Sequence, residues 1–230
     1  MQDQPPPWEN ARAGNAPEPA TICKEATSVP KRDFKKLLKD LYVPPTEPVM
    51  VEVPPMNFIM VDGTGDPNTE ASYEAAIEAL YSVAYTIKFI VKGRSADLDF
   101  VVPPLEGLWW AEDMAAFAES DKDAWQWTMM VMMPEPVDRE LFAQGGETAR
   151  EKKRLAAIDE VRFEEFAEGL SAQVMHIGPY AEEAPTIERL HAFIAEQGHE
   201  RRGKHHEIYL SDPRRTKPEK LKTVIRQPVT

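Results

Sequence analysis

The pattern of hydrophobic and polar positions predicts a unit of strand, glycine turn and helix that occurs twice along the chain. The first copy has a strand-like stretch at residues 56–63 and a helix pattern from about residue 70. The second copy has the same order at residues 171–178 and from about residue 185. A repeated pattern of this kind indicates a duplicated unit. Duplicated α+β units usually share one sheet, and the cleft at their seam is a place where small molecules bind.

The helix of each copy carries a clear apolar stripe. Stripe residues recur at helical spacing at Tyr73, Ile77, Leu80, Ala84, Ile87 and Val91 in the first helix, and at Ile187, Leu190, His191 and Ile194 in the second. Asn68 or Thr69 is placed to cap the first helix and Gly93 to end it. Pro185 lies in the first turn of the second helix and Gly198 at its end. Each helix is therefore expected to pack one face on a sheet.

The remaining segments are mostly strand-like. Strands are expected at residues 49–53, 58–61, 99–102, 107–110, 125–133, 161–167, 172–177, 205–210 and 221–229, and short helices at 33–42 and 112–119. Residues 138–158 have the pattern of a charged helix. The pair Gly145-Gly146 is a candidate break in that helix, because glycine costs about 1 kcal/mol at an interior helical position.

These elements predict an α+β fold. Two strand-helix-strand-strand units share one antiparallel, saddle-shaped sheet, with helices on one face and a ligand cleft on the other. The proline-rich residues 1–30 are expected to be a disordered or loosely packed tail, and the sequence leaves open whether it covers the cleft. Residues 31–230 are expected to form the single domain, with repeats at about 49–135 and 160–230.

The balance of charges limits the classes of partner. The 230 residues include 27 Lys and Arg against 39 Asp and Glu, a formal net charge of −12. This charge disfavours a nucleic-acid backbone and an anionic membrane surface, and it attracts cationic ligands. Cys23 is the single cysteine, which excludes an internal disulfide. There is no apolar run of about 18 residues and no signal-peptide pattern, so a cytoplasmic location is expected.

Strand alternation places a carboxylate among aromatic side chains. Within residues 205–210, Glu207 and Tyr209 share one face with His205, whereas the apolar set on the other face is expected to pack on the helices. Trp109 and Trp110 point opposite ways, so at least one is placed to line the same groove. A carboxylate against apolar walls has a raised pKa, which suits a general acid or base near neutral pH.

Plainer interpretations stay open for these patterns. Aromatic residues on strands are usually part of the core, and a glutamate on a sheet face is usually solvated. His205 and His206 lie on opposite sides of a strand, so no metal site is expected there. The glycine-rich residues 62–66 lack a dinucleotide fingerprint and are interpreted as a turn, and no Gly-x-Ser-x-Gly nucleophile motif occurs.

Five separated segments, in order along the chain, resemble the GyrI-like small-molecule-binding proteins. They are residues 33–42 (DFKKLLKDLY), 62–68 (DGTGDPN), 104–110 (PLEGLWW), 175–180 (MHIGPY) and 205–223 (HHEIYLSDPRRTKPEKLKT). The resemblance spans about residues 31–230. It implies a duplicated fold with an aromatic pocket at the seam and a buried glutamate in the second unit, at Glu207. It also implies hydrolase activity, because the stand-alone members most like this chain open the cyclopropane ring of DNA-alkylating natural products.

The candidate site residues follow from the alternation and the resemblance together. They are catalytic Glu207 and Tyr180 and ligand-binding Tyr73, Trp109, Trp110, Trp127, Met133 and Tyr209. Glu207 is expected to take a proton from water while Tyr180 or Tyr73 donates to the developing phenolate oxygen. No cofactor and no metal is required for this chemistry.

Three functions compete at this stage. The first is a cytoplasmic hydrolase that detoxifies cyclopropanoid or similar electrophilic genotoxins. The alternative is a non-catalytic protein that binds and sequesters several aromatic or cationic drugs. A third is a protein-interaction role, such as topoisomerase inhibition, which the surface gives no reason to prefer. The expected partners are aromatic or cationic small molecules, and the choice between a monomer and a homodimer stays open.

Overall fold

The computed structural model describes residues 30–111 and 122–230. The expected tail and the helix expected at 112–119 lie outside these residues. The strands are β1 (Val49–Val53), β2 (Met56–Thr64), β3 (Leu105–Trp110), β4 (Gln126–Met133), β5 (Arg162–Phe166), β6 (Gly169–Ile177), β7 (His205–Tyr209) and β8 (Lys222–Pro228). The α-helices are α1 (Phe34–Leu37), α2 (Lys39–Tyr42), α3 (Ala71–Arg94), α5 (Arg139–Lys153) and α6 (Ala184–Glu196).

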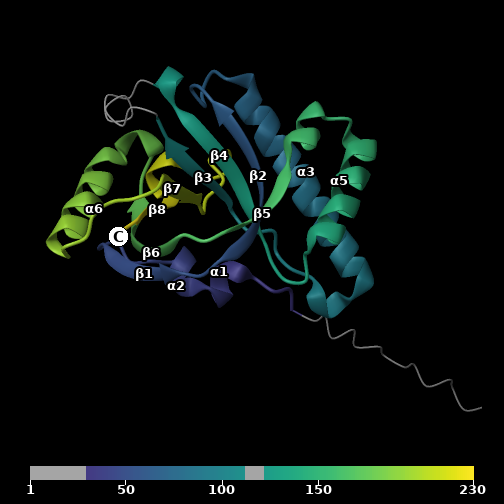
Figure 1. Ribbon diagram of the computed structural model, residues 1–230, viewed down its shortest axis with the longest axis horizontal. Coiled ribbons are helices and arrows are strands. Elements are labelled where there is room, and N and C mark those ends of the chain that lie inside the picture. The colour runs from purple at the N-terminus through teal and green to yellow at the C-terminus, as the bar shows by residue number, and fades with distance from the viewer. Residues whose placement is uncertain (1–29, 112–121) are drawn as a thin grey trace, which may run out of the picture.

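All eight strands belong to one antiparallel sheet, in the order β1-β6-β8-β7-β3-β4-β2-β5. The sheet is strongly curled, with α6 at one end and α3 and α5 at the other, while α1 and α2 lie near β1 (Figure 1). The α+β class and the shared antiparallel sheet are therefore confirmed.

The order of the strands shows the duplication directly. The unit β2-α3-β3-β4 corresponds to the unit β6-α6-β7-β8, and the two meet where β3 pairs with β7. We call this pairing the seam. β1 precedes the first unit and pairs with β6 of the second unit. β5 precedes the second unit and pairs with β2 of the first unit. This exchange ties the two units into one folded body.

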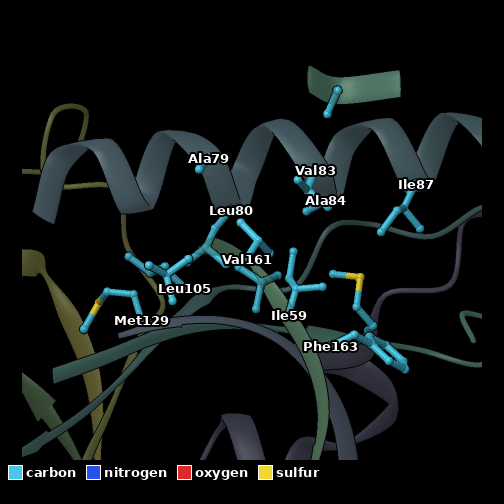
Figure 2. Close-up of a cluster of buried hydrophobic side chains, with 14 of the residues drawn as sticks. Ile59, Ala79, Leu80, Val83, Ala84, Ile87, Leu105, Met129, Val161 and Phe163 are labelled. Atoms are coloured by element: carbon cyan, nitrogen blue, oxygen red, sulfur yellow. The ribbon is translucent and has the colours of Figure 1, made fainter. Parts of the chain in front are cut away.

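The helix α3 packs its apolar stripe against the first unit. Leu80, Ala84 and Ile87 are fully buried against the sheet, together with Ile59 of β2 and Met129 of β4. Figure 2 shows the α3 side chains pointing down onto these strands. Full burial of one such aliphatic side chain contributes roughly 1.5–3 kcal/mol, so this stripe is the main anchor of α3.

The helix α5 corrects one expectation, because Gly145-Gly146 does not break it. Asp138 caps the helix by accepting a hydrogen bond from the backbone N–H of Leu141 at 2.8 Å. A Cβ atom at Gly145 would lie only 2.4 Å from Cγ1 of Ile87, whereas one at Gly146 would meet open space. Gly145 therefore lets α5 approach α3 closely, and this packing offsets the low helix propensity of glycine.

Other boundaries differ in detail from the pattern. Residues 33–42 form two four-residue helices rather than one, and residues 99–102 contain only an isolated bridge between Phe100 and Arg32. The helix α3 continues through Gly93 to Arg94. In the part of the chain that the structure describes, no helix has the length and apolar character needed to cross a membrane.

The two faces of the sheet are covered differently. α3 and α6 flank one face and leave the seam open between them, whereas Leu41 and Tyr42 of α2 pack on the other face against Ile208 and Val224. The position of the cleft thus differs from the expected one, since it opens on the same side of the sheet as α3 and α6. The opposite face is filled instead by packed side chains, among them Leu41, Tyr42, Phe58 and Ile208.

Candidate functional site

A solvent-open hollow lies above the seam, between α3 and α6. Its floor is made by β3 and β7, and its lining includes Tyr73, Trp109, Tyr180, Glu207 and Tyr209. Tyr73 comes from the first turn of α3, and Tyr180 comes from the short turn before α6. The two units therefore contribute equivalent parts to one site.

Glu207 sits at the centre of the hollow's floor. Tyr209 donates its hydroxyl to Oε2 of Glu207 at 2.7 Å, and Nε2 of His205 donates to Oε1 at 3.1 Å. Nε1 of Trp109 in turn donates to the Tyr209 hydroxyl at 3.0 Å. Alternation along β7 puts all three β7 side chains on one face, and Trp109 lies directly opposite His205 in the register.

The neighbours of Glu207 stabilise its ionised form. Burial by itself raises the pKa of this carboxyl, but the hydrogen bond and electrostatic attraction of His205, together with Tyr209, outweigh burial and leave the pKa lowered. Glu207 is therefore a carboxylate at neutral pH, already held by two donors. A fixed, ionised carboxylate in an aromatic hollow is suited to act as a general base.

Gly107 makes room for this arrangement. It lies opposite Glu207 in the register between β3 and β7. A Cβ atom at this position would lie 2.6 Å from Cε of Met129, 2.8 Å from Nε1 of Trp109 and 3.2 Å from the Tyr209 hydroxyl. Glycine inside a strand commonly marks such a close approach. Any larger residue would displace the hydrogen bond between Trp109 and Tyr209.

A second carboxyl, Glu183, faces the first. Glu183 is the N-cap residue of α6 and is 5% exposed. Burial, followed by the charge of Glu207, raises its pKa to about 9. The hydroxyl of Thr223 lies beside it, yet neither Thr223 Oγ1 nor Glu183 Oε1 has a partner at hydrogen-bonding geometry among the described residues. The pair thus holds one proton at neutral pH, on Glu183, next to an ionised Glu207.

Aromatic rings form the walls around the two carboxyls. The ring of Tyr180 packs edge-on against Tyr209 with centroids 5.6 Å apart, and the ring of Tyr73 lies 6.0 Å from that of Trp109. Trp125 meets Trp109 edge-on at 5.7 Å. Burial raises the pKa of Tyr180 to about 12 and that of Tyr73 further, so both hydroxyls stay protonated and able to donate.

The structure brings five of the eight candidate residues together and places three elsewhere. Trp110 points to the opposite face, where Nζ of Lys204 lies 3.2 Å from its ring centroid. Trp127 is fully buried and supports Tyr73 from below, with the two rings edge-on at 5.2 Å. Met133 is buried in the core beneath α3 and α5. These three do not line the hollow.

Sequence reasoning missed Glu183 and the contact that His205 makes. The chain marks Glu183 only as the second of two glutamates just before a proline-started helix, and acidic residues are common at helix starts. Strand alternation predicts the correct face for His205. The adjacent histidines raise the question of a metal site, and nothing in the local pattern indicates the contact between His205 and Glu207. In the described ranges, 30–111 and 122–230, no three His, Cys, Asp or Glu side chains are grouped to hold a metal ion.

The opposite face of the seam carries a buried network of charges. His206 donates from Nε2 to Glu106 at 3.0 Å and from Nδ1 to Glu168 at 2.9 Å. Arg226 donates to Glu168 at 3.1 Å, and the Tyr42 hydroxyl donates to Glu106 at 2.9 Å. All five side chains are almost completely buried. The network joins β3, β7 and β8 to α2 directly behind the floor that carries Glu207.

Comparison with known proteins finds one family and several close structures. The GyrI-like small-molecule-binding domain matches residues 46–230. An uncharacterised conserved protein from Listeria innocua is 45% identical, with a TM-score of 0.80, and the match covers 87% of this chain and 100% of that one. Two structures named hydrolases from Listeria innocua are 43% and 42% identical, with TM-scores of 0.78 and 0.76 and the same coverage. No curated protein matches the chain.

Proposed function

The chain belongs to the GyrI-like small-molecule-binding domain family, and from this premise we propose that it is a hydrolase that adds water to strained electrophiles of the cyclopropanoid class. The observation that carries the proposal is Glu207, held by Tyr209 and His205 on the floor of an aromatic hollow that Glu183 also lines. The names of two close relatives as hydrolases support the reaction type. Destruction of such genotoxins in the cytoplasm would be a detoxification role.

The reaction needs one base and one acid. Water attacks the less substituted carbon of a cyclopropane joined to a dienone, a carbon–oxygen bond forms, and the bond from that carbon to the carbon shared with the dienone ring breaks. The electron pair of that bond moves into the dienone and leaves a phenolate oxygen. Glu207 takes the proton from the attacking water, and a proton donor converts the phenolate into a phenol. The net change is the addition of one water molecule.

The side chains divide these tasks by their pKa values. Glu183 is the better proton donor, because its pKa of about 9 lies nearer to neutral pH than that of Tyr180, at about 12. Tyr180 or Tyr73 donates a hydrogen bond to the dienone oxygen as negative charge develops there. After each turnover the proton taken up by Glu207 passes to the neighbouring Glu183, which restores the starting state.

The walls of the hollow hold the substrate flat. Trp109 and Tyr209 are fixed to each other by a hydrogen bond, so their rings form a rigid surface beside Glu207. Planar aromatic ligands stack on such surfaces, and stacking orients the reacting carbon toward the base. We assign ligand binding to Tyr73, Trp109 and Tyr209, and we leave Trp110, Trp127 and Met133 out of the proposed site.

The test is turnover of a cyclopropyl-dienone DNA alkylator, followed by mass spectrometry. The wild type is expected to give a product heavier by one water, and Glu207→Gln is expected to lose this activity by about 100-fold or more. Glu165→Gln is the matched control, because Glu165 is an exposed strand glutamate on β5 at the edge of the sheet. Equal rates in the wild type and in Glu207→Gln would refute the proposed base.

A binding function is the second candidate. The breadth of the hollow, its acidic floor and the net charge of −12 favour capture of aromatic or cationic drugs. Titration of lipophilic cations and neutral aromatic dyes, read by tryptophan fluorescence, measures this binding independently of turnover. Saturable quenching with no water-addition product from any of several cyclopropyl-dienone substrates would select this function over hydrolysis.

A further inference from the structure

The two carboxyls of the site have unequal sets of donors. Glu207 accepts from Tyr209 at 2.7 Å and from His205 at 3.1 Å, one donor on each oxygen. Among the described residues, Oε1 of Glu183 is buried and has no partner at hydrogen-bonding geometry. The Thr223 hydroxyl lies beside this carboxyl, and the charge of Glu207 flanks it. Donors stabilise the ionised form of a carboxyl, so this inequality decides which of the two carries the negative charge.

His205 is one of the two donors that Glu207 has and Glu183 lacks. It is 3% exposed and lies on the same face of β7 as Glu207, whereas His206 turns to the opposite face. Three groups of the described residues, from different elements, lie around its imidazole. Glu207 of the same strand accepts from Nε2, Trp109 of β3 lies opposite in the register, and His191 of α6 is near enough for His205 to help lower its pKa.

His191 in turn lies beside a cation, Arg201. Nη1 of Arg201, in the segment after α6, donates to Nδ1 of His191 at 3.0 Å. Burial, then Arg201, then His205 lower the pKa of His191 to about 4, so His191 is neutral. Among the described residues, Glu207 is thus the carboxylate that is hydrogen-bonded to His205.

We infer that His205 is a positioning residue for the proposed hydrolysis: by donating from Nε2 to Glu207, it makes Glu207 the ionised member of the carboxyl pair and leaves the shared proton on Glu183. The inference rests on the proposed function for its catalytic meaning. The assignment of charge within the pair does not depend on turnover and can be measured by itself.

Three substitutions at His205 separate donation from mere filling of space. His205→Gln keeps an amide donor where Nε2 stands. His205→Leu keeps bulk without a donor, and His205→Asn keeps polarity but is too short to reach Glu207 and serves if the leucine variant does not fold. His199→Gln is the matched control, since the described contact of His199 is with the backbone oxygen of Thr230 and not with Glu207 or Glu183.

The first readout is the titration of the glutamate side chains by NMR, with carbon-13 at the carboxyl carbon. Glu207→Gln and Glu183→Gln assign the two signals. In the wild type and in His205→Gln, we expect Glu207 to be ionised and Glu183 protonated at pH 6–7. In His205→Leu or His205→Asn, the midpoint of Glu207 is expected to rise by about one pH unit or more. An unchanged Glu207 titration in these two variants would overturn the inference.

The second readout is the dependence of kcat on pH for the cyclopropyl-dienone substrate. Loss of the donor is expected to move the acidic limb of the kcat profile upward by about one pH unit or more, to lower kcat by about tenfold or more on that limb and to leave KM nearly unchanged. A uniform loss of rate with the wild-type pH profile would mean that His205 is only structural. If the wild type shows no turnover, the proposed function fails, while the NMR result still decides the assignment of charge.

Discussion

At the scale of single residues, the site depends on an acid that the fold keeps protonated. Its raised pKa of about 9, caused first by burial and then by the charge of Glu207, has a consequence for stability. Because the pKa of Glu183 is higher in the folded protein than in the unfolded chain, its contribution to stability is fully present below about pH 4.5. This contribution is lost as the pH rises through about 9. At neutral pH, Glu183 therefore lowers the free energy of unfolding.

Glu183→Gln is accordingly expected to raise the free energy of unfolding and to lower kcat. At pH 7 the gain in unfolding free energy is on the order of 3 kcal/mol, and it should grow from pH 5 to pH 9. kcat for the proposed hydrolysis should fall by about 100-fold, because the amide cannot donate a proton to the phenolate. Urea unfolding at several pH values and single-substrate kinetics check both parts, and a variant less stable than the wild type at pH 8 would contradict the first.

The tyrosine that polarises the dienone can be identified at the same scale. Tyr180 is 38% exposed at the mouth of the hollow, whereas Tyr73 is packed between Trp109 and Trp127. We expect Tyr180→Phe to lower kcat by about tenfold or more, with tryptophan quenching by substrate retained. Tyr73→Phe is the companion variant, and a larger loss of kcat there would transfer the role to Tyr73.

At the scale of elements, two adjacent glycines of α5 are expected to behave in opposite ways. A Cβ atom at Gly145 would collide with Ile87 of α3, but one at Gly146 would meet open space. Gly145→Ala should lower the unfolding free energy by about 1–3 kcal/mol through overpacking. Gly146→Ala should raise it by roughly 1 kcal/mol through helix propensity. Urea denaturation of the two variants measures the difference, and equal effects would show that α3 and α5 do not pack closely.

At the scale of the whole molecule, the charge network behind the floor joins the two units across the seam. Burial by itself lowers the pKa of His206, but Glu168 and Glu106 outweigh burial and raise it to about 9. Burial likewise raises the pKa of Glu168, but His206 and Arg226 outweigh it and hold the value at about 2. The stabilisation from His206 is complete below about pH 6.5 and is lost as the pH rises through about 9. That from Glu168 is complete above about pH 4.5 and is lost as the pH falls through about 2.

His206→Gln is therefore expected to cost about 3–5 kcal/mol at pH 6, because it removes the buried cation that Glu106 and Glu168 share and leaves only Arg226 to balance their two charges. The difference from the wild type should narrow as the pH rises from about 6.5 to 9. Urea unfolding across this range measures it, with His199→Gln as the control. A difference that stays constant over the range would show that His206 is not charged in the folded protein.

The sequence by itself determined the α+β class, the helices α3 and α6, and the strand alternation, which puts Glu207, Tyr209 and His205 on one face of β7 without any distant contact. The expectation that Glu207 is the buried glutamate of a pocket came from the resemblance to the GyrI-like proteins. The tertiary structure alone decided the rest. Side chains of α2 pack on the opposite face, so the hollow opens between α3 and α6, and packing against Ile87 keeps Gly145 inside a helix. The pairing of β3 with β7 brought Trp109 to Tyr209, and the start of α6 brought Glu183 to Glu207. A proton shared between side chains far apart in the chain is a property of distance and burial, which no local pattern of residues encodes.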